Sequence, residues 1–243
     1  MPIKVHTEFL AKDAIKAVNR GDLIIVVDVL RCTSTIVTAL ANGAKAIIPV
    51  KTLKEAERVH SKNPGYILAG ERGGLKPRRF DMGNSPLEYT REKVFGRVIV
   101  LTTTSGTLAL TCSKDAKWVL IGSFLNAKSV AEKAAFIAEA EGIDISIIQS
   151  GTNGRFSLED FICAGAIISK LPSELIELSD PAQAALLVFR YGEKDLCANI
   201  MKSEHSKRLI ELGFNEDIEF SCQIDLFTIA PLYKSGVITK NNF

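Results

Sequence analysis

The chain alternates short, continuous apolar runs with amphipathic stretches of helical period. The apolar runs, which we interpret as strands, are Leu23–Asp28, Ala46–Val50, Tyr66–Ala69, Arg97–Thr102, Trp118–Ile121 and Ile143–Gln149. The amphipathic stretches between them are Thr33–Ala41, Leu53–Ser61, Gly106–Ser113 and Ala127–Glu141. Continuous apolar runs are typical of strands buried on both faces. The alternation therefore predicts an α/β fold with a mostly parallel or mixed sheet flanked by helices.

The character of the chain changes after Gln149. Four helical patterns follow at Ser157–Lys170, Asp180–Tyr191, Lys194–Lys202 and Ser203–Leu212. We predict a mainly helical C-terminal section over about residues 157–243, with a short strand or return loop near its end. No repeat, low-complexity segment or obvious linker interrupts the sequence, which favours a single domain over residues 1–243.

Charge and composition limit the kinds of partner. The formal net charge is +2, and basic residues are not concentrated in one half, so we expect no binding to nucleic acid or to a membrane. No apolar stretch approaches the roughly 20 residues that span a bilayer, and the N-terminus lacks the apolar region of a secretory signal. Five widely spaced cysteines without a C-x-x-C pair argue against a zinc site or a disulfide framework. We expect a cytoplasmic protein, with a homo-oligomer as one possible state.

The first strand ends in a group of residues suited to ligand binding. Leu23–Asp28 ends on an acid, Arg31 follows, and a run of hydroxyl side chains then opens a helical pattern. In open α/β folds, ligands bind at the carboxyl edge of the sheet. The acid suits a metal ion, and the arginine suits an anion. The alternative is a structural ion pair between Asp28 and Arg31 beside a capped helix.

Four more polar segments follow strands in the same way. They are Gly70–Gly74 with its continuation Phe80–Pro86, Thr102–Thr107, Gly122–Asn126, and Ser150–Arg155 followed by Glu159 and Asp160. Since parallel strands bring their carboxyl ends to one side, we expect these segments to converge in one cleft. Each has a structural alternative as well, because hydroxyl side chains cap helices and glycines form turns.

The expected cleft is rich in acids. The hard oxygen donors are Asp28, Glu71, Asp81, Glu159 and Asp160. Mg²⁺ prefers a few carboxylates, with waters and substrate phosphate completing its coordination. Glu159 and Asp160 are about 100° apart on a helix, so both cannot aim at one ion, and we choose Asp160.

Basic groups complement these acids. Arg31, Arg72 and Arg155 carry forked donors for phosphate, sulfonate or carboxylate. His205 begins a helical stretch and reaches the cleft only if the C-terminal section folds over it, so a surface or capping role is favoured.

The common phosphate motifs are absent from the sequence. It has neither G-x-x-x-x-G-K-[ST] nor G-x-G-x-x-G after a strand. A phosphorylated aspartate of the haloacid-dehalogenase type at Asp28 needs a second acid two positions later, where this chain has Leu30. We therefore expect metal-bound water to be the nucleophile.

Six motifs occur in an order that resembles the 2-phosphosulfolactate phosphatase family. They are Val27–Arg31, Gly70–Arg72, Phe80–Pro86, Thr102–Thr107, Gly122–Asn126 and Leu158–Asp160. The likeness extends from about Lys4 to the Pro231 region. Its one small departure is Ser105, where the family usually has asparagine.

The resemblance implies a Mg²⁺-dependent phosphatase that converts 2-phospho-3-sulfolactate to 3-sulfolactate and phosphate, a step of coenzyme M biosynthesis. The expected metal ligands are Asp28, Glu71, Asp81 and Asp160. The expected catalytic residues are Asp28, Arg31, Arg72 and Asp160, and the expected substrate-binding residues are Thr103, Thr104, Ser105, Asn84, Ser123 and Arg155. The alternative is a non-catalytic binding protein or sensor for a small phosphorylated or sulfonated acid. Acids beside the basic residues favour catalysis, because an anion sensor has little use for carboxylates.

Overall fold

One mixed sheet passes through the molecule, which we describe from a computed structural model for residues 2–240. Within these residues the sheet has ten strands, in the order β4-β5-β3-β10-β9-β6-β2-β7-β1-β8. The strands are β1 (Ile3–Glu8), β2 (Leu23–Val27), β3 (Ala46–Pro49), β4 (Ile67–Gly70), β5 (Val98–Thr102), β6 (Val119–Gly122), β7 (Ile145–Gln149), β8 (Ile176–Leu178), β9 (Leu232–Lys234) and β10 (Val237–Thr239).

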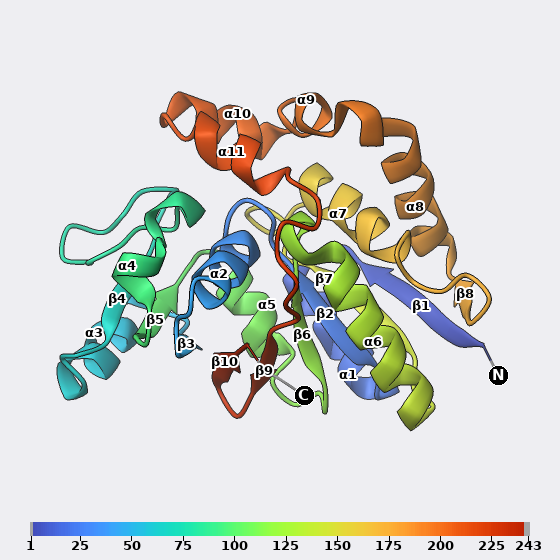
Figure 1. The fold of residues 1–243 in the computed structure, drawn as a ribbon, viewed down its shortest axis with the longest axis horizontal. Helices are drawn as coiled ribbons and strands as arrows, with labels where there is room; N and C mark the ends of the chain where they lie inside the picture. The colour runs from blue at the N-terminus through green and yellow to red at the C-terminus, as the bar shows by residue number, and fades with distance from the viewer. Residues whose placement is uncertain (1, 241–243) are drawn as a thin grey trace.

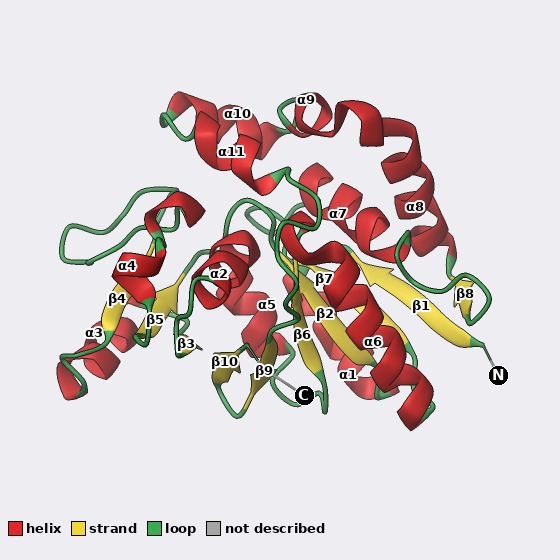
Figure 2. Ribbon diagram, viewed as in Figure 1, coloured by secondary structure: helices red, strands yellow, loops and turns green. Residues whose placement is uncertain are grey.

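Helices connect and cover the strands (Figure 2). They are α1 (Ala14–Arg20), α2 (Cys32–Ala41), α3 (Leu53–Lys62), α4 (Arg91–Val94), α5 (Gly106–Cys112), α6 (Ala127–Glu141), α7 (Leu158–Ile168), α8 (Asp180–Gly192), α9 (Leu196–Ile200), α10 (Glu204–Glu211) and α11 (Asn215–Ser221). In Figure 1, α10 and α11 lie above the sheet, and α8 runs down its right side. The predicted α/β class, the mixed sheet and the helical C-terminal section are confirmed.

The sheet consists of two parallel groups joined by an antiparallel hairpin. The strands β4, β5 and β3 are parallel to one another, and so are β6, β2, β7, β1 and β8. In the hairpin, Ile238 of β10 pairs with Ile47, and Leu232 of β9 pairs with Leu120. The pairings β3–β10, β10–β9 and β9–β6 are all antiparallel. The strands of one group therefore run antiparallel to the strands of the other. Figure 1 shows the hairpin between the groups, with α2 and α5 in the space above it.

Burial on both faces explains why β2 is a continuous apolar run. Leu23, Ile25 and Val27 pack in a cluster with side chains of α6 and α7. Ile24 and Val26 belong to a second cluster, with α2 and α5. Because successive strand side chains point to opposite faces, a strand between two helical layers needs apolar residues at every position.

The predicted strands and helices all occur, with bounds within two residues of those expected. The prediction missed β1, α1, α4, β8 and α11. The side chains of β1 alternate between buried and more exposed positions, unlike the continuous runs that identified the other strands. The predicted C-terminal section extends to residue 243, but residues 241–243 lie outside the part of the chain that the structure describes.

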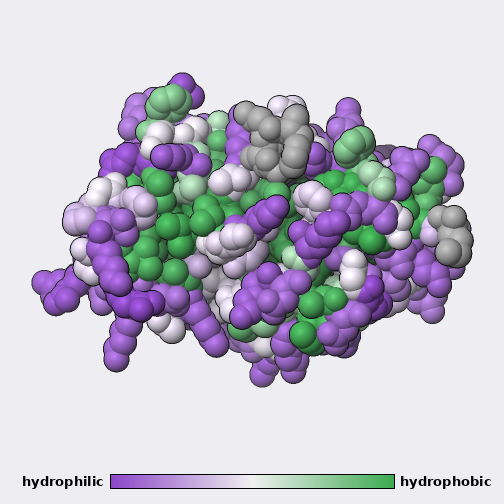
Figure 3. Space-filling model, turned by 90° about the horizontal axis from the view of Figure 1, so that it is seen from below, coloured by the Kyte–Doolittle hydropathy of each residue, from purple (hydrophilic) through white to green (hydrophobic). Residues whose placement is uncertain are grey.

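The surface mixes apolar and polar side chains. Figure 3 shows the face seen from below, where hydrophobic patches alternate with hydrophilic ones. Within residues 2–240, none of the helices has the length and apolar character needed to cross a membrane.

Helices α7 and α8 approach each other closely at Gly165. A Cβ atom added there would lie 2.1 Å from the carbonyl oxygen of Ala185 and 2.7 Å from the Cβ of Phe189. We expect Gly165→Ala to lower the free energy of unfolding by at least about 1 kcal/mol, because overpacking outweighs the helix propensity gained from alanine. Urea unfolding measures the loss. Gly65→Ala is the matched control, since nothing lies within 4 Å of its added Cβ; equal stabilities of the two variants would contradict the prediction.

Candidate active site

Loops from both parallel groups line one cavity, together with α7 and α10. Its volume is about 130 Å³, below the roughly 300–1,000 Å³ of drug-sized pockets, so it suits a compact ligand. The lining side chains include Asp28, Arg31, Glu71, Asn84, Thr103, Thr104, Ser105, Thr152, Asn153, Glu159, Asp160, His205 and Arg208.

The loops converge for a different reason from the one expected. The carboxyl ends of β2 and β5 do not belong to one parallel group, yet the loops after them meet in the cavity. They approach where α5 begins against α2. A Cβ atom on Gly106 would lie 2.5 Å from the Cβ of Cys32 and 2.8 Å from Oδ2 of Asp28. The missing side chain at Gly106 therefore lets the two groups meet.

Asp28 lies at the centre of this contact and is 7% exposed. Its Oδ1 accepts a hydrogen bond of 3.1 Å from the backbone N–H of Cys32. Burial raises the pKa of Asp28 to about 7, although the Cys32 N–H opposes the rise, and the negative charges of Glu71 and Glu159 add to it. The carboxylate therefore lies in a buried site where the positive charge of Arg31 only partly offsets the cost of burial and the neighbouring acids.

Two other acids, Glu71 and Asp160, anchor the loops through backbone N–H groups. Oδ1 and Oδ2 of Asp160 accept from Val29 at 2.9 Å and from Gly151 at 3.1 Å. Burial raises the pKa of Asp160 well above its ordinary value, as do the charges of Asp28 and Glu159.

Glu71 makes the equivalent connection on the other side of the cavity. Its Oε2 accepts from the N–H of Gly74 at 2.8 Å, and its Oε1 accepts from the N–H of Thr104 at 2.7 Å and from the Thr104 hydroxyl at 2.8 Å. Both oxygens of each anchoring carboxylate are thus already engaged by the protein.

Glu159 lies beside Asp160, the acid that we choose from the sequence as a metal ligand, and it differs from Asp160 in its hydrogen bonds. It is 2% exposed and lines the cavity, and none of the hydrogen bonds found within residues 2–240 involves its carboxylate. The difference between the two acids follows from Ser157, whose hydroxyl caps α7 by accepting from the N–H of Asp160. This cap places Asp160 at N3, a position from which acids reach back to backbone N–H groups.

Only Arg31 of the three predicted arginines lines this cavity. Its Nη1 pairs with Oδ2 of Asp217 at 2.7 Å, so its ion-pair partner is Asp217 and not Asp28. Arg72 bonds instead to the carbonyl of Glu71 at 2.6 Å and to the hydroxyl of Thr102 at 2.8 Å. Burial lowers the pKa of Arg72. Arg155 lines a neighbouring cavity that shares Glu159 and His205 with the first.

Some of the remaining predicted residues line the cavity, and others do not. Thr103, Thr104, Ser105 and Asn84 line the cavity, and the side-chain oxygen of Asn84 is buried without a hydrogen-bond partner. Ser123 lies outside it, where its backbone N–H donates to the side chain of Asn126 in a capping box.

Asp81 also lies outside the cavity, on the exposed loop after β4. Its carboxylate accepts from the N–H of Leu68 at 2.8 Å, which ties the loop back to its own strand.

The C-terminal section folds over the cavity, so the surface or capping role favoured for His205 is wrong. Nε2 of His205 lies 2.8 Å from the carbonyl oxygen of Leu30. A carbonyl oxygen only accepts, so Nε2 carries the proton, while Nδ1 is buried without a partner. Arg208 on the same helix also lines the cavity, and we did not predict it from the sequence.

We expect the stability of the metal-free protein to fall as pH rises from about 4 through 7. Unfolded Asp28 loses its proton near 3.8, whereas the folded group keeps it to about 7. Between these values the folded state binds more protons, so deprotonation opposes folding by up to about 1.4 kcal/mol per pH unit. Urea unfolding in a chelator at pH 5 and pH 8 measures this slope. The free energy of unfolding of Asp28→Asn should fall less steeply with pH than that of the unaltered chain. An identical slope for the two proteins would contradict the prediction.

Comparison with known proteins identifies the family of this chain. Residues 9–236 match the family model described as 2-phosphosulpholactate phosphatase. A protein of Thermotoga maritima named probable 2-phosphosulfolactate phosphatase is 46% identical over 219 residues, covering 90% of this chain and 92% of that protein. A protein of Clostridium acetobutylicum with the same name is 40% identical over 239 residues, covering 97% of this chain and 100% of that protein. The chain therefore belongs to the 2-phosphosulfolactate phosphatase family.

Proposed function

We propose that this chain is a Mg²⁺-dependent phosphatase that hydrolyses 2-phospho-3-sulfolactate, or a similar small phosphorylated acid, to the hydroxy acid and phosphate. The names of its relatives support this substrate. The observation that carries the proposal is the meeting of Asp28, Glu159 and Arg31 in one small, buried cavity. Coenzyme M biosynthesis is the pathway we propose for the reaction. The cytoplasmic location, the homo-oligomer and the absence of nucleic-acid binding stay predictions.

The acids at the cavity fit a magnesium ion held largely by substrate and water. No group of three or more His, Cys, Asp or Glu side chains within residues 2–240 is arranged to hold a metal. Mg²⁺ commonly binds through only one or two carboxylates plus substrate phosphate. Asp28 and Glu159 would be these two, because Glu71 and Asp160 are engaged by N–H groups. When bound, the ion supplies positive charge to the phosphate and lowers the pKa of a water molecule.

The other side chains would bind and orient the substrate. A guanidinium group has five N–H donors, and Arg31 uses two of them in its bonds to Asp217 and Gly74. Its other donors would bind an anionic oxygen and stabilise the negative charge that grows in the transition state. Thr103 and Ser105, near the start of α5, would provide further donors, and Asn84 a polar side chain that no other described residue satisfies.

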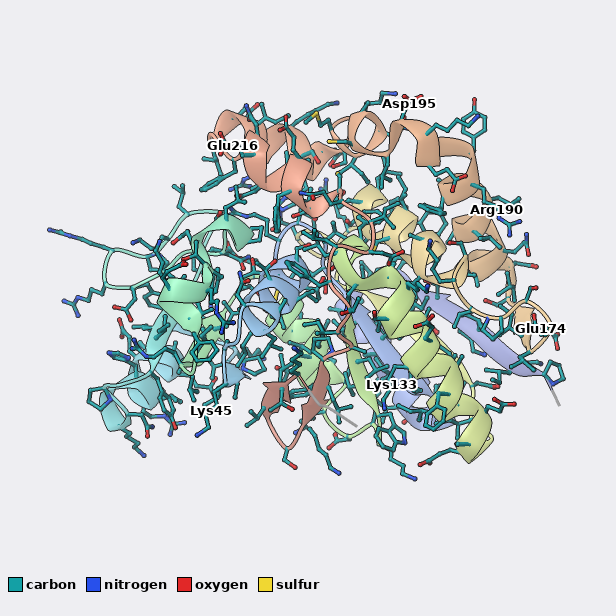
Figure 4. The ribbon with its side chains drawn as sticks, viewed as in Figure 1. Lys45, Lys133, Glu174, Arg190, Asp195 and Glu216 are labelled. Carbon is teal, nitrogen blue, oxygen red and sulfur yellow. The ribbon has the colours of Figure 1, made fainter. Side chains whose placement is uncertain are left out.

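We expect Asp28→Asn to lower kcat/KM for phosphate release at least 100-fold and to raise the Mg²⁺ concentration needed for half-maximal activity at least tenfold. The reason is that the substitution removes one of the two carboxylates proposed to hold the ion. A phosphate-release assay over a magnesium titration measures both values. Asp195→Asn is the matched control, because Asp195 is exposed on the C-terminal helices (Figure 4). Full activity of Asp28→Asn at ordinary magnesium would remove Asp28 from the metal site.

Glu159 and Asp160 should respond differently to loss of charge. We expect Glu159→Gln to raise the magnesium requirement at least tenfold with little loss of stability, since its carboxylate has no hydrogen bond to lose. Asp160→Asn should instead lower the free energy of unfolding, because one oxygen that accepts an N–H becomes a donor. Magnesium titration and urea unfolding of both variants test the assignment, and the reverse pattern would restore Asp160 as the ligand.

A sensor for a small phosphorylated or sulfonated acid is the alternative function. Measuring both binding and phosphate release, on one panel of small phosphate esters with Mg²⁺ present, distinguishes the phosphatase from the sensor. Binding without any release would favour the sensor.

A further inference from the structure

Asp217 connects two parts of the cavity wall without lining the cavity. It lies on α11 and is 3% exposed. Its Oδ2 accepts from Nη1 of Arg31 at 2.7 Å, and its Oδ1 accepts from the hydroxyl of Ser85 at 2.6 Å. Arg31 follows β2 and Ser85 follows Asn84 in the loop after β4. One carboxylate therefore joins the C-terminal section to both parallel groups of the sheet.

The guanidinium of Arg31 is held on several sides. Besides Asp217, its Nη2 donates to the carbonyl oxygen of Gly74 at 2.6 Å. Its carbon Cζ lies 4.0 Å from the centre of the Phe214 ring, just before α11, in a cation–π contact. These contacts fix the plane of the group at the cavity wall, which leaves its remaining donors in one orientation.

We propose that Asp217 is the positioning residue for Arg31, aiming the guanidinium at the anionic group of the substrate. The proposal rests on the function proposed above and adds α11 to the site. Asp217 is absent from the cavity lining, so it acts through Arg31.

Charge and positioning predict opposite effects of removing this carboxylate. The negative charge of Asp217 repels an anion bound at Arg31, so by charge alone Asp217→Asn would tighten anion binding. If Asp217 holds the guanidinium in place, the same substitution weakens binding, because the donors lose their fixed orientation. The direction of the change therefore distinguishes the two roles.

The experiment measures binding of inorganic phosphate by calorimetry, with Mg²⁺ present, for the full chain and its variants. We expect Asp217→Asn to weaken phosphate binding at least fivefold and to lower kcat/KM for phosphate release at least tenfold. The matched control is Glu216→Gln, whose side chain is exposed on the same helix (Figure 4); it should bind phosphate as the unaltered chain does. Unchanged or tighter binding by Asp217→Asn would overturn the proposal.

A double substitution separates positioning from general damage to the fold. In an Arg31→Lys background the forked group is gone, so adding Asp217→Asn should weaken phosphate binding less than twofold further. A fivefold loss in both backgrounds would show that Asp217 does not act through Arg31. If the unaltered chain binds phosphate but releases none from phosphate esters, the proposed function fails, while the binding measurements still decide the role of Asp217.

Discussion

The burial of like charges around one cavity is the constraint on which the arrangement of the loops depends. Asp28, Glu71, Glu159 and Asp160 are each less than a tenth exposed. Negative charges in so small a space repel one another and lose their hydration. The protein compensates with backbone N–H donors from the loops after β2, β4, β5 and β7. Asp160 consequently fixes the loop after β2 through Val29, and Glu71 fixes the loop after β5 through Thr104. The other N–H contacts of the buried acids hold their own segments in place.

This arrangement explains why the acids differ in role despite their similar burial. Two of them, Glu71 and Asp160, use both oxygens to hold backbone, so their loss affects the loops. Asp28 and Glu159 have oxygens left for a ligand, and burial, together with the charges of Glu71 and Glu159, raises the pKa of Asp28. A cation in the cavity would relieve the repulsion that the N–H groups only partly offset. Acids that look equivalent in the sequence thus differ in how far the protein's own N–H groups already engage their oxygens.

The fold was largely predictable, because apolar periodicity directly reflects burial between helical layers. The site was predictable only in part. Arg72, Asp81 and Ser123 follow strands as expected, but each is engaged by backbone or side-chain groups of its own loop or of the strands β4 and β5. The occurrence of polar residues after strands does not reveal which of them form such hydrogen bonds. Whether Asp160 or Glu159 faces the cavity depends on the phase of a helix that the Ser157 cap sets, and the sequence pattern alone does not fix that phase. The placing of Asp217 beside Arg31 spans 186 positions of sequence, and no local pattern encodes it.

The β9–β10 hairpin has a consequence for how the chain acquires its structure during synthesis. The strands of one parallel group are complete at Thr102, and those of the other at Leu178. Within residues 2–240, only the hairpin over Leu232–Thr239 pairs with both groups. A growing chain emerges from its N-terminal end, and domains fold as segments become available. The two groups therefore stay with an unpaired edge each, at β3 and β6, until the hairpin has been made. Exposed strand edges attract other chains, so this interval is when the nascent protein is most exposed to aggregation.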